Sequence, residues 1–269
     1  MVVCALGDLT LDVSVRLQGP LAAGADTDAE IHLGAGGQAA NVAAWAAALG
    51  VEARFIGKRG TDRAGRLVTA ELEGKGVRVL GPANGRNGVV CVLVSPSGER
   101  SMAPDRGAAA KLRADEIDPA WLEGCAHLFV SGYALFHEPT RSAAKKAIAA
   151  AREHGSAVSV DLSSWSSLQA AGAETIRALL NELQPDAAFA NEDEERAIGG
   201  RLDGVTWILK RGVRGCSFDG EEREIVPVEM VVDSTGAGDA LAAGWIVGGP
   251  DLALEAAARC VQHQGAMPP

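Results

Sequence analysis

The sequence is poor in aromatic residues and in basic ones. Aromatic side chains make up 4% of its 269 residues, and 25 lysines and arginines face 35 aspartates and glutamates, for a net charge of −10. So few aromatic residues argue against a function that depends on stacking with nucleic-acid bases. The acidic balance excludes bulk attraction to nucleic acid or to an anionic membrane. A phosphorylated ligand would therefore need local backbone dipoles, a few cations or a metal ion.

Paired cysteines, long apolar runs and a basic leader are also missing. The five cysteines show no Cys-x-x-Cys spacing, which is typical of reduced thiols in a cytosolic protein. No apolar run approaches the ~18 residues of a membrane helix, and Met1–Leu11 does not resemble a signal peptide. We expect a cytoplasmic protein with neither nucleic acid nor a membrane as partner.

Short β-like runs alternate with Ala-rich helical segments along the chain. The predicted strands are Val2–Leu6, Ala53–Ile56, His127–Val130, Ala157–Val160, Ala187–Ala190 and Val205–Leu209. The predicted helices are Gly37–Leu49, Arg63–Lys75, Thr140–His154, Glu174–Leu183, Glu192–Ile198, Ala237–Val247 and Leu252–Gln262. This alternation predicts an α/β fold with a parallel sheet and helices on both faces. Nothing marks a boundary between independent domains, so one domain over 1–269 is expected.

Two segments break this rhythm. Val13–Leu33 and Gly88–Met102 are extended, turn-rich and β-like. Insertions of this kind in an α/β chain predict a small accessory sheet.

The most specific motif is Asp233-Ser234-Thr235-Gly236-Ala237-Gly238-Asp239. It follows a β-like run, Ile225–Val232, and opens a helix. Unpaired N–H groups at a helix start, reinforced by the helix dipole, form an anion site. Asp239 in the first turn could accept a proton from an attacking hydroxyl while the amides stabilise a transferring phosphoryl group. The alternative is a helix start whose acid only complements the dipole.

A second glycine-rich turn, Gly34-Ala35-Gly36-Gly37-Gln38-Ala39-Ala40-Asn41, also opens a helix. Its small residues allow close approach to a ligand, and the Asn41 amide can bind a polyol. The string also matches G-x-G-x-x-A, which with Lys58-Arg59 leaves an NADP-dependent oxidoreductase as an alternative. That fingerprint should follow the first strand directly, and here it does not. A plain helix start is the third interpretation.

Together the two motifs resemble the signatures of the PfkB family of carbohydrate and nucleoside kinases, the ribokinase-like group. The first signature resembles Gly36–Ala43 with Leu49-Gly50, and the second resembles Asp233–Asp239. Weaker similarities lie at Gly57–Gly65, Asn191–Glu194 and Lys210–Gly215. The resemblance extends from Val3 to about Pro268. It implies a three-layer α/β domain with a mostly parallel sheet and a β-sheet lid formed by about 13–33 and 88–106.

The resemblance also implies an ATP-dependent, Mg²⁺-requiring kinase that phosphorylates an alcohol group of a small sugar. Asp239 would be the catalytic base, and the amides of Gly236, Ala237 and Gly238 the anion hole. The remaining implied roles are substrate binding by Asp12, Gly36, Gly37 and Asn41, nucleotide binding by Asn191, Lys210, Gly212 and Gly215, and a water-mediated Mg²⁺ contact by Glu194.

Asp233 and the Thr235 carbonyl match the monovalent-cation site of members that use K⁺, and the lid often forms a homodimer interface. Gln38 departs from the lysine of many ribokinases, Ser234 replaces threonine, and Pro269 stands where a serine helps complete the cation site. Two alternatives therefore stay open besides the sugar kinase: a nucleoside kinase of the same family, and a non-catalytic protein that binds nucleotide or sugar.

Overall fold

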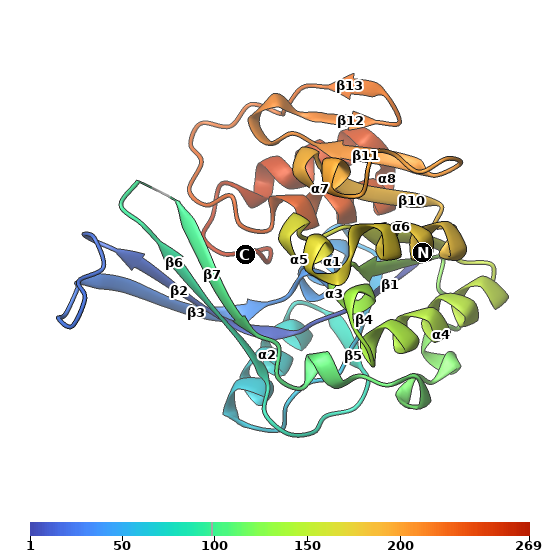
Figure 1. Cartoon of the computed structure of the whole chain (residues 1–269), viewed down its shortest axis with the longest axis horizontal. Coiled ribbons are helices and arrows are strands. Elements are labelled where there is room, and N and C mark those ends of the chain that lie inside the picture. The colour runs from blue at the N-terminus through green and yellow to red at the C-terminus, as the bar shows by residue number, and fades with distance from the viewer. Residues whose placement is uncertain (98) are drawn as a thin grey trace.

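The computed structural model describes residues 1–97 and 99–269, which form a large sheet and a small one (Figure 1). The strand order in the large sheet is β13-β12-β11-β10-β9-β8-β1-β4-β5. Its parallel strands are β1 (Val2–Leu6), β4 (Glu52–Ile56), β5 (Val77–Leu80), β8 (His127–Ser131), β9 (Ala157–Asp161), β10 (Ala187–Asn191) and β11 (Thr206–Lys210). At one edge, β12 (Cys216–Phe218) and β13 (Glu221–Arg223) are antiparallel. The predicted parallel α/β sheet is confirmed.

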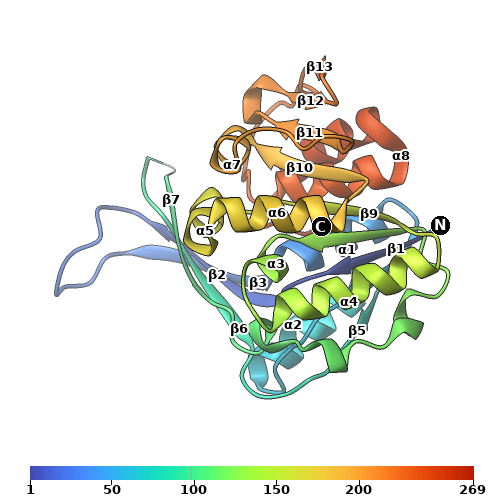
Figure 2. The same ribbon diagram turned by 45° about the vertical axis from the view of Figure 1, so that its right-hand side comes forward.

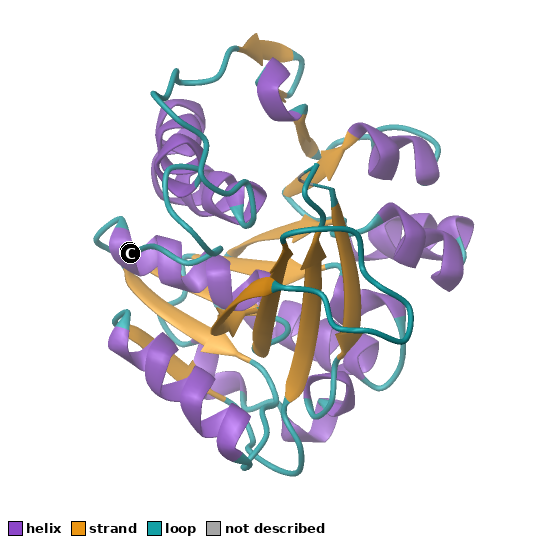
Figure 3. Cartoon of the chain, turned by 90° about the vertical axis from the view of Figure 1, so that its left-hand side faces the viewer, coloured by secondary structure: helices purple, strands orange, loops and turns teal. Residues whose placement is uncertain are grey.

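Helices cover both faces of this sheet and give it two separate cores (Figure 3). One face packs against α1 (Gln38–Ala48), α2 (Arg63–Gly74) and α8 (Ala237–Cys260). The other packs against α3 (Tyr133–Phe136), α4 (Thr140–Glu153), α5 (Trp165–Ala171), α6 (Ala173–Leu183) and α7 (Glu192–Ala197) (Figure 2). The strands are apolar on both faces, as a sheet buried between two helical layers requires. Among the described residues, no helix has both the length and the apolar character needed to cross a bilayer.

The small sheet projects from one side of the body (Figure 1). It consists of β3 (Ala29–Gly36), β2 (Thr10–Leu17), β6 (Gly88–Val94) and β7 (Arg100–Asp105), in that order. Asp12 pairs with Gly34 and Ser14 with His32, so these residues share one face of the sheet. That face turns toward the body, because all four line one cavity with the C-terminal segment 263–269. The two β-like insertions therefore form an accessory sheet, as predicted.

Some boundaries and elements differ from the sequence-based expectation. The run Ile225–Val232 is not a strand: β13 ends at Arg223, and the segment continues as an irregular loop. Pro227 interrupts this run and cannot donate a ladder hydrogen bond. The short strand β5 and the helix α5 were not predicted. The last two predicted helices form the two arms of α8, which is broken at Gly249 (φ 82°) before Pro250.

Candidate active site

Asp239 lies in the first turn of α8, just after a glycine-rich turn. Gly236 caps the helix with φ 78°, and a Cβ there would lie 2.6 Å from Ala266, so only glycine fits. The amide of Ala237 makes only a long 3.4 Å contact with the Ser234 carbonyl. A Cβ built on Gly238 would lie 3.6 Å from Nζ of Lys210. The predicted base and anion-hole residues thus lie together, next to a lysine.

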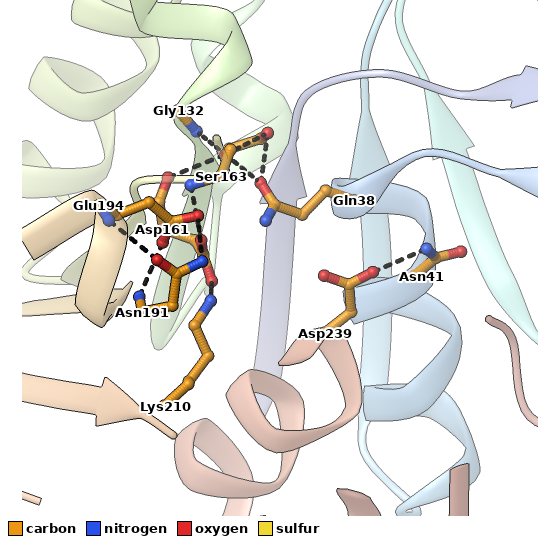
Figure 4. A network of polar contacts seen from close by, with 10 residues as sticks. Gln38, Asn41, Gly132, Asp161, Ser163, Asn191, Glu194, Lys210 and Asp239 are labelled. Atoms are coloured by element: carbon orange, nitrogen blue, oxygen red, sulfur yellow. Dashed lines mark hydrogen bonds and ion pairs between the residues drawn. The ribbon is translucent and has the colours of Figure 1, made fainter. Parts of the chain in front are cut away.

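The carboxylate of Asp239 is held by a side chain from the first glycine-rich motif. Nδ2 of Asn41 donates to its Oδ2 at 2.7 Å (Figure 4). Burial raises the pKa of Asp239 to about 7, and the negative charge of Asp161 adds to the shift. Hydrogen bonds from Asn41 and Gln38 and the charge of Lys210 act in the opposite direction. A carboxyl group with a pKa near neutrality is well suited to accept a proton.

Three neighbouring strands of the large sheet end in polar residues that form one cluster. β9 ends at Asp161, β10 at Asn191 and β11 at Lys210. Asn191 is the register partner of Lys210. Nζ of Lys210 donates to Oδ2 of the buried Asp161 at 2.6 Å (Figure 4). The carboxyl ends of parallel strands are the usual place for ligands in such sheets.

Lys210 is the cation of this cluster, and it faces two carboxyl groups, those of Asp161 and Glu194. Asn191 caps α7: its Oδ1 accepts from the backbone N–H of Glu194 at 2.8 Å, and its backbone N–H donates to Oε2 of Glu194 at 2.8 Å. Burial raises the pKa of Glu194, an effect that Lys210 opposes. Burial alone would lower the pKa of Lys210, but the attraction of Asp161 and Glu194 outweighs it and raises that pKa. Lys210 is therefore a permanent cation beside the glycine turn.

Gln38 connects this cluster to Asp239, a connection that the sequence analysis missed. The hydroxyls of Ser131 and Ser163 both donate to Oε1 of Gln38 at 2.6 Å. Ser163 has φ 64°, an unusual conformation for a serine, and its amide is held by Oδ1 of Asp161 at 2.8 Å. With its oxygen engaged twice, the Gln38 amide can direct only its NH₂ group toward Asp239. Two features of the sequence could have indicated this connection: Ser131-Gly132 follows a predicted strand, and Gln38 stands where many ribokinases have a lysine.

Asp12 of the small sheet packs against the glycines of the first glycine-rich motif. Asp12 accepts a hydrogen bond from Oγ1 of Thr10 at 2.9 Å, and burial raises its pKa to about 6. A Cβ on Gly36 would lie 2.1 Å from Oδ2 of Asp12, and one on Gly37 (φ 102°) would lie 2.3 Å from the Asp8 carbonyl oxygen. Gly37 is thus required by close backbone packing at the start of α1, and a side chain at Gly36 would displace the carboxylate of Asp12. Oδ1 of the buried Asn41 has no hydrogen-bond partner among the described residues.

An apolar cavity of about 320 Å³ lies on the other side of the glycine turn. Three of the predicted nucleotide-binding residues line it, together with Ala237 and Gly238: Lys210, Gly212 and Gly215. Asn191 is not in the lining but adjoins it through Lys210. Ile225, Val226, Val228 and Val231 also line the cavity, which explains why this apolar run is not a strand. The cavity can accept a flat apolar group whose charged end faces Lys210.

Asp233 and Thr235 lie at the entry to the glycine turn. Oδ1 of Asp233 accepts from the Thr235 amide at 2.9 Å and from its hydroxyl at 2.7 Å. The same carboxylate forms an ion pair with Arg100 of β7 at 2.5 Å. Within 1–97 and 99–269, no group of three or more His, Cys, Asp or Glu side chains is arranged to hold a metal ion.

The three-layer α/β sheet, with an acid at a helix start, a lysine and an apolar cavity at its carboxyl edge, fits a small-molecule kinase of ribokinase-like fold. Comparison with known proteins gives the family. The family model described as pfkB family carbohydrate kinase matches residues 2–267, so the chain belongs to this family. It is a sugar or nucleoside kinase that uses ATP and an alcohol acceptor, and the dinucleotide-binding interpretation of Gly34–Ala39 is wrong.

Curated relatives and solved structures agree with this assignment. The chain is 29% identical over 242 residues to 5-dehydro-2-deoxygluconokinase of Bacillus velezensis, covering 79% of this chain and 72% of the relative. It is 31% identical over 228 residues to fructokinase-1 of Oryza sativa, covering 76% and 70%. The adenosine kinase structure from Sinorhizobium meliloti matches with a TM-score of 0.86 at 22% identity, over 99% of this chain and 95% of that one. A putative ribokinase II from E. coli in complex with ATP and Mg²⁺ matches with 0.82 at 26% identity, over 99% and 94%.

Proposed function

We propose that the protein transfers the terminal phosphoryl group of ATP to a hydroxymethyl group of a small sugar, with Asp239 as the general base. One observation supports this most directly: the Asp239 carboxylate lies beside Lys210 and the glycine turn, and a donor from the substrate-side motif, Asn41, holds it. Asp239 takes the proton of the acceptor hydroxyl, the oxygen forms a bond to phosphorus, and the bond to the leaving ADP oxygen breaks.

The chain's own cations and amides would stabilise the charge that moves during this step. Phosphoryl transfer needs positioning and electrostatic stabilisation more than covalent catalysis. Lys210 and the amides of Gly236–Gly238 would face the transferring group. Mg²⁺ would enter with ATP as part of the substrate, with Asn191 and Glu194 near its water shell.

Substrate and nucleotide would approach Asp239 from opposite sides. Asp12, Gly36, Gly37 and Asn41 supply acceptors and close backbone approach for a polyol, and the unpartnered Oδ1 of Asn41 can accept a hydrogen bond from a hydroxyl group. The nucleotide base would enter the apolar cavity lined by Gly212 and Gly215. Relatives named fructokinase and 5-dehydro-2-deoxygluconokinase support a sugar as the acceptor.

The small sheet would be the lid over the sugar, and its outer face the contact with a second copy. Asp12 and Ser14 face the body, so the alternating residues Val13, Val15 and Ile31 face outward. Ile31 is 60% exposed. An apolar sheet face of this kind is typical of an interface between subunits.

A coupled assay of ADP release across a panel of sugars, sugar acids and nucleosides tests the function. We expect ATP-dependent turnover with a simple sugar, and no turnover without Mg²⁺. Turnover with nucleosides alone would favour the nucleoside kinase. Specific ATP binding without turnover on any member of the panel would favour the non-catalytic alternative.

A further inference from the structure

The carboxylate of Asp233 is surrounded by donors. Besides the amide and hydroxyl of Thr235, it accepts from the Gly265 amide at 3.1 Å on Oδ2 and from Nη2 of Arg100 at 2.5 Å on Oδ1. The Asp233 side chain is only 12% exposed. An acid this buried requires a compensating positive charge.

That charge comes from a distant part of the chain. Arg100 is the first residue of β7 in the small sheet, far in sequence from the turn that starts α8. Its side chain is 26% exposed, and its guanidinium also donates to Oγ of Ser234 at 3.3 Å. Arg100 therefore contacts two consecutive residues of the turn that leads into Gly236.

The donors at Asp233 leave little room for the monovalent cation that the family resemblance implies. Such an ion would need oxygen ligands from Asp233 and from the Thr235 carbonyl. Oδ1 of Asp233 already accepts three donors, and the Thr235 carbonyl lies 3.4 Å from the Cys260 thiol, which donates to it. A second cation next to the guanidinium would also be repelled. These residues do not fit a bound K⁺.

We propose that the guanidinium of Arg100 is the permanent counter-charge of Asp233, so that the protein works without a monovalent metal ion. Arg100 is then a positioning residue: it fixes Asp233, which holds the Thr235 amide and hydroxyl and thereby the turn from which the anion hole begins. Because Arg100 belongs to the small sheet, the same ion pair couples the position of that sheet to the geometry of the turn.

The test compares the wild type with Arg100→Gln in potassium chloride, in tetramethylammonium chloride and in tetramethylammonium chloride containing a little guanidinium chloride, at equal ionic strength. Arg86→Gln is the matched control, because Arg86 pairs with Asp105 at 2.6 Å in an exposed ion pair near the same sheet. The thermal midpoint of unfolding is measured without substrates, and kcat is measured with the best acceptor from the panel. Only the kcat measurement depends on the proposed function. If the protein shows no activity, the thermal midpoints still test whether Arg100 takes the place of a monovalent cation.

We expect the wild type and Arg86→Gln to be insensitive to the choice of cation. In tetramethylammonium, Arg100→Gln should have a lower midpoint and a kcat reduced about tenfold to a hundredfold, the value of one charge-assisted hydrogen bond. Potassium or guanidinium should restore both in this variant alone. A wild type that requires K⁺, an Arg100→Gln variant that behaves like wild type, or a loss that neither ion restores would overturn the proposal.

Discussion

The amide of Asn41 and the carboxylate of Asp239 are 2.7 Å apart, although they belong to different helices and to the two glycine-rich motifs of the sequence. This contact joins the substrate side of the site to the start of α8. It also favours the ionised form of Asp239, because the amide donates to the negative charge.

Replacing Asn41 should therefore move the pH profile. With a pKa of about 7, Asp239 is protonated below neutrality, so kcat/KM should rise through pH 7 and level off above it. In Asn41→Leu the ionised form loses its donor, and the inflection should move upward by about one to two pH units, the equivalent of one hydrogen bond to a charged group. A profile measured from pH 5.5 to 9.5 gives the answer. An inflection at the same pH in both proteins would show that Asn41 does not affect the pKa of the base.

Asp12 should reduce stability at neutral pH. Burial raises its pKa from 3.8 to about 6, so between these values the folded chain holds a proton that the unfolded chain releases, and stability falls as pH rises. Asp12→Asn removes this cost. We expect its Tm to match the wild type near pH 4 and to exceed it above pH 6 by up to about 6–12 °C, because a pKa displaced by about two units corresponds to roughly 3 kcal/mol in a chain of this size. The exposed Asp26→Asn is the control and should show no such crossover.

Much of this site could be predicted from the sequence, because its residues lie in local motifs. Asp239 was predicted from its own glycine-rich motif, whereas Asp12 and Lys210 were expected only because of the family resemblance; Lys210 ends β11, at the edge of the sheet where ligands usually bind. Arg100, Ser131 and Ser163 act through contacts between distant segments, which no local pattern encodes.

One error has a specific physical cause. Ile225–Val232 has the β-branched composition of a strand, but its apolar side chains line the cavity beside the glycine turn instead. Composition predicts that these side chains avoid water, but it does not show whether they pack in a sheet or line a cavity. The strand β5, only four residues long, was too short to give a clear period.

The two serines that hold Gln38 should affect catalysis without affecting nucleotide binding. Ser163→Ala removes one of the two hydroxyls on Oε1 of Gln38 and lets the amide rotate. We expect kcat to fall about tenfold, the loss of roughly one hydrogen bond, with the Kd for ATP unchanged by calorimetry. Ser166→Ala, an exposed neighbour, should behave as wild type. An equal loss in both variants would show that Gln38 needs no such support.

The outer face of the small sheet should control the oligomeric state. A glutamate at position 31 would place a charge in the middle of the apolar face, at a site that is 60% exposed in the single chain. We expect sedimentation velocity to show a dimer for the wild type and a monomer for Ile31→Glu. Leu21→Glu, at a residue 64% exposed in the loop between β2 and β3, should remain dimeric. A monomeric wild type would contradict the proposed interface.

The role of Asp239 is tested most directly by separating turnover from nucleotide binding in Asp239→Asn. Asparagine keeps the shape of the side chain but cannot accept the hydroxyl proton, so kcat should fall by about 10²–10⁴, the usual contribution of a general base. The Kd for ATP with Mg²⁺ should stay close to the wild-type value, and the exposed Asp251→Asn on the same helix should change neither quantity. A kcat for Asp239→Asn equal to that of the wild type would show that this carboxylate is not the base.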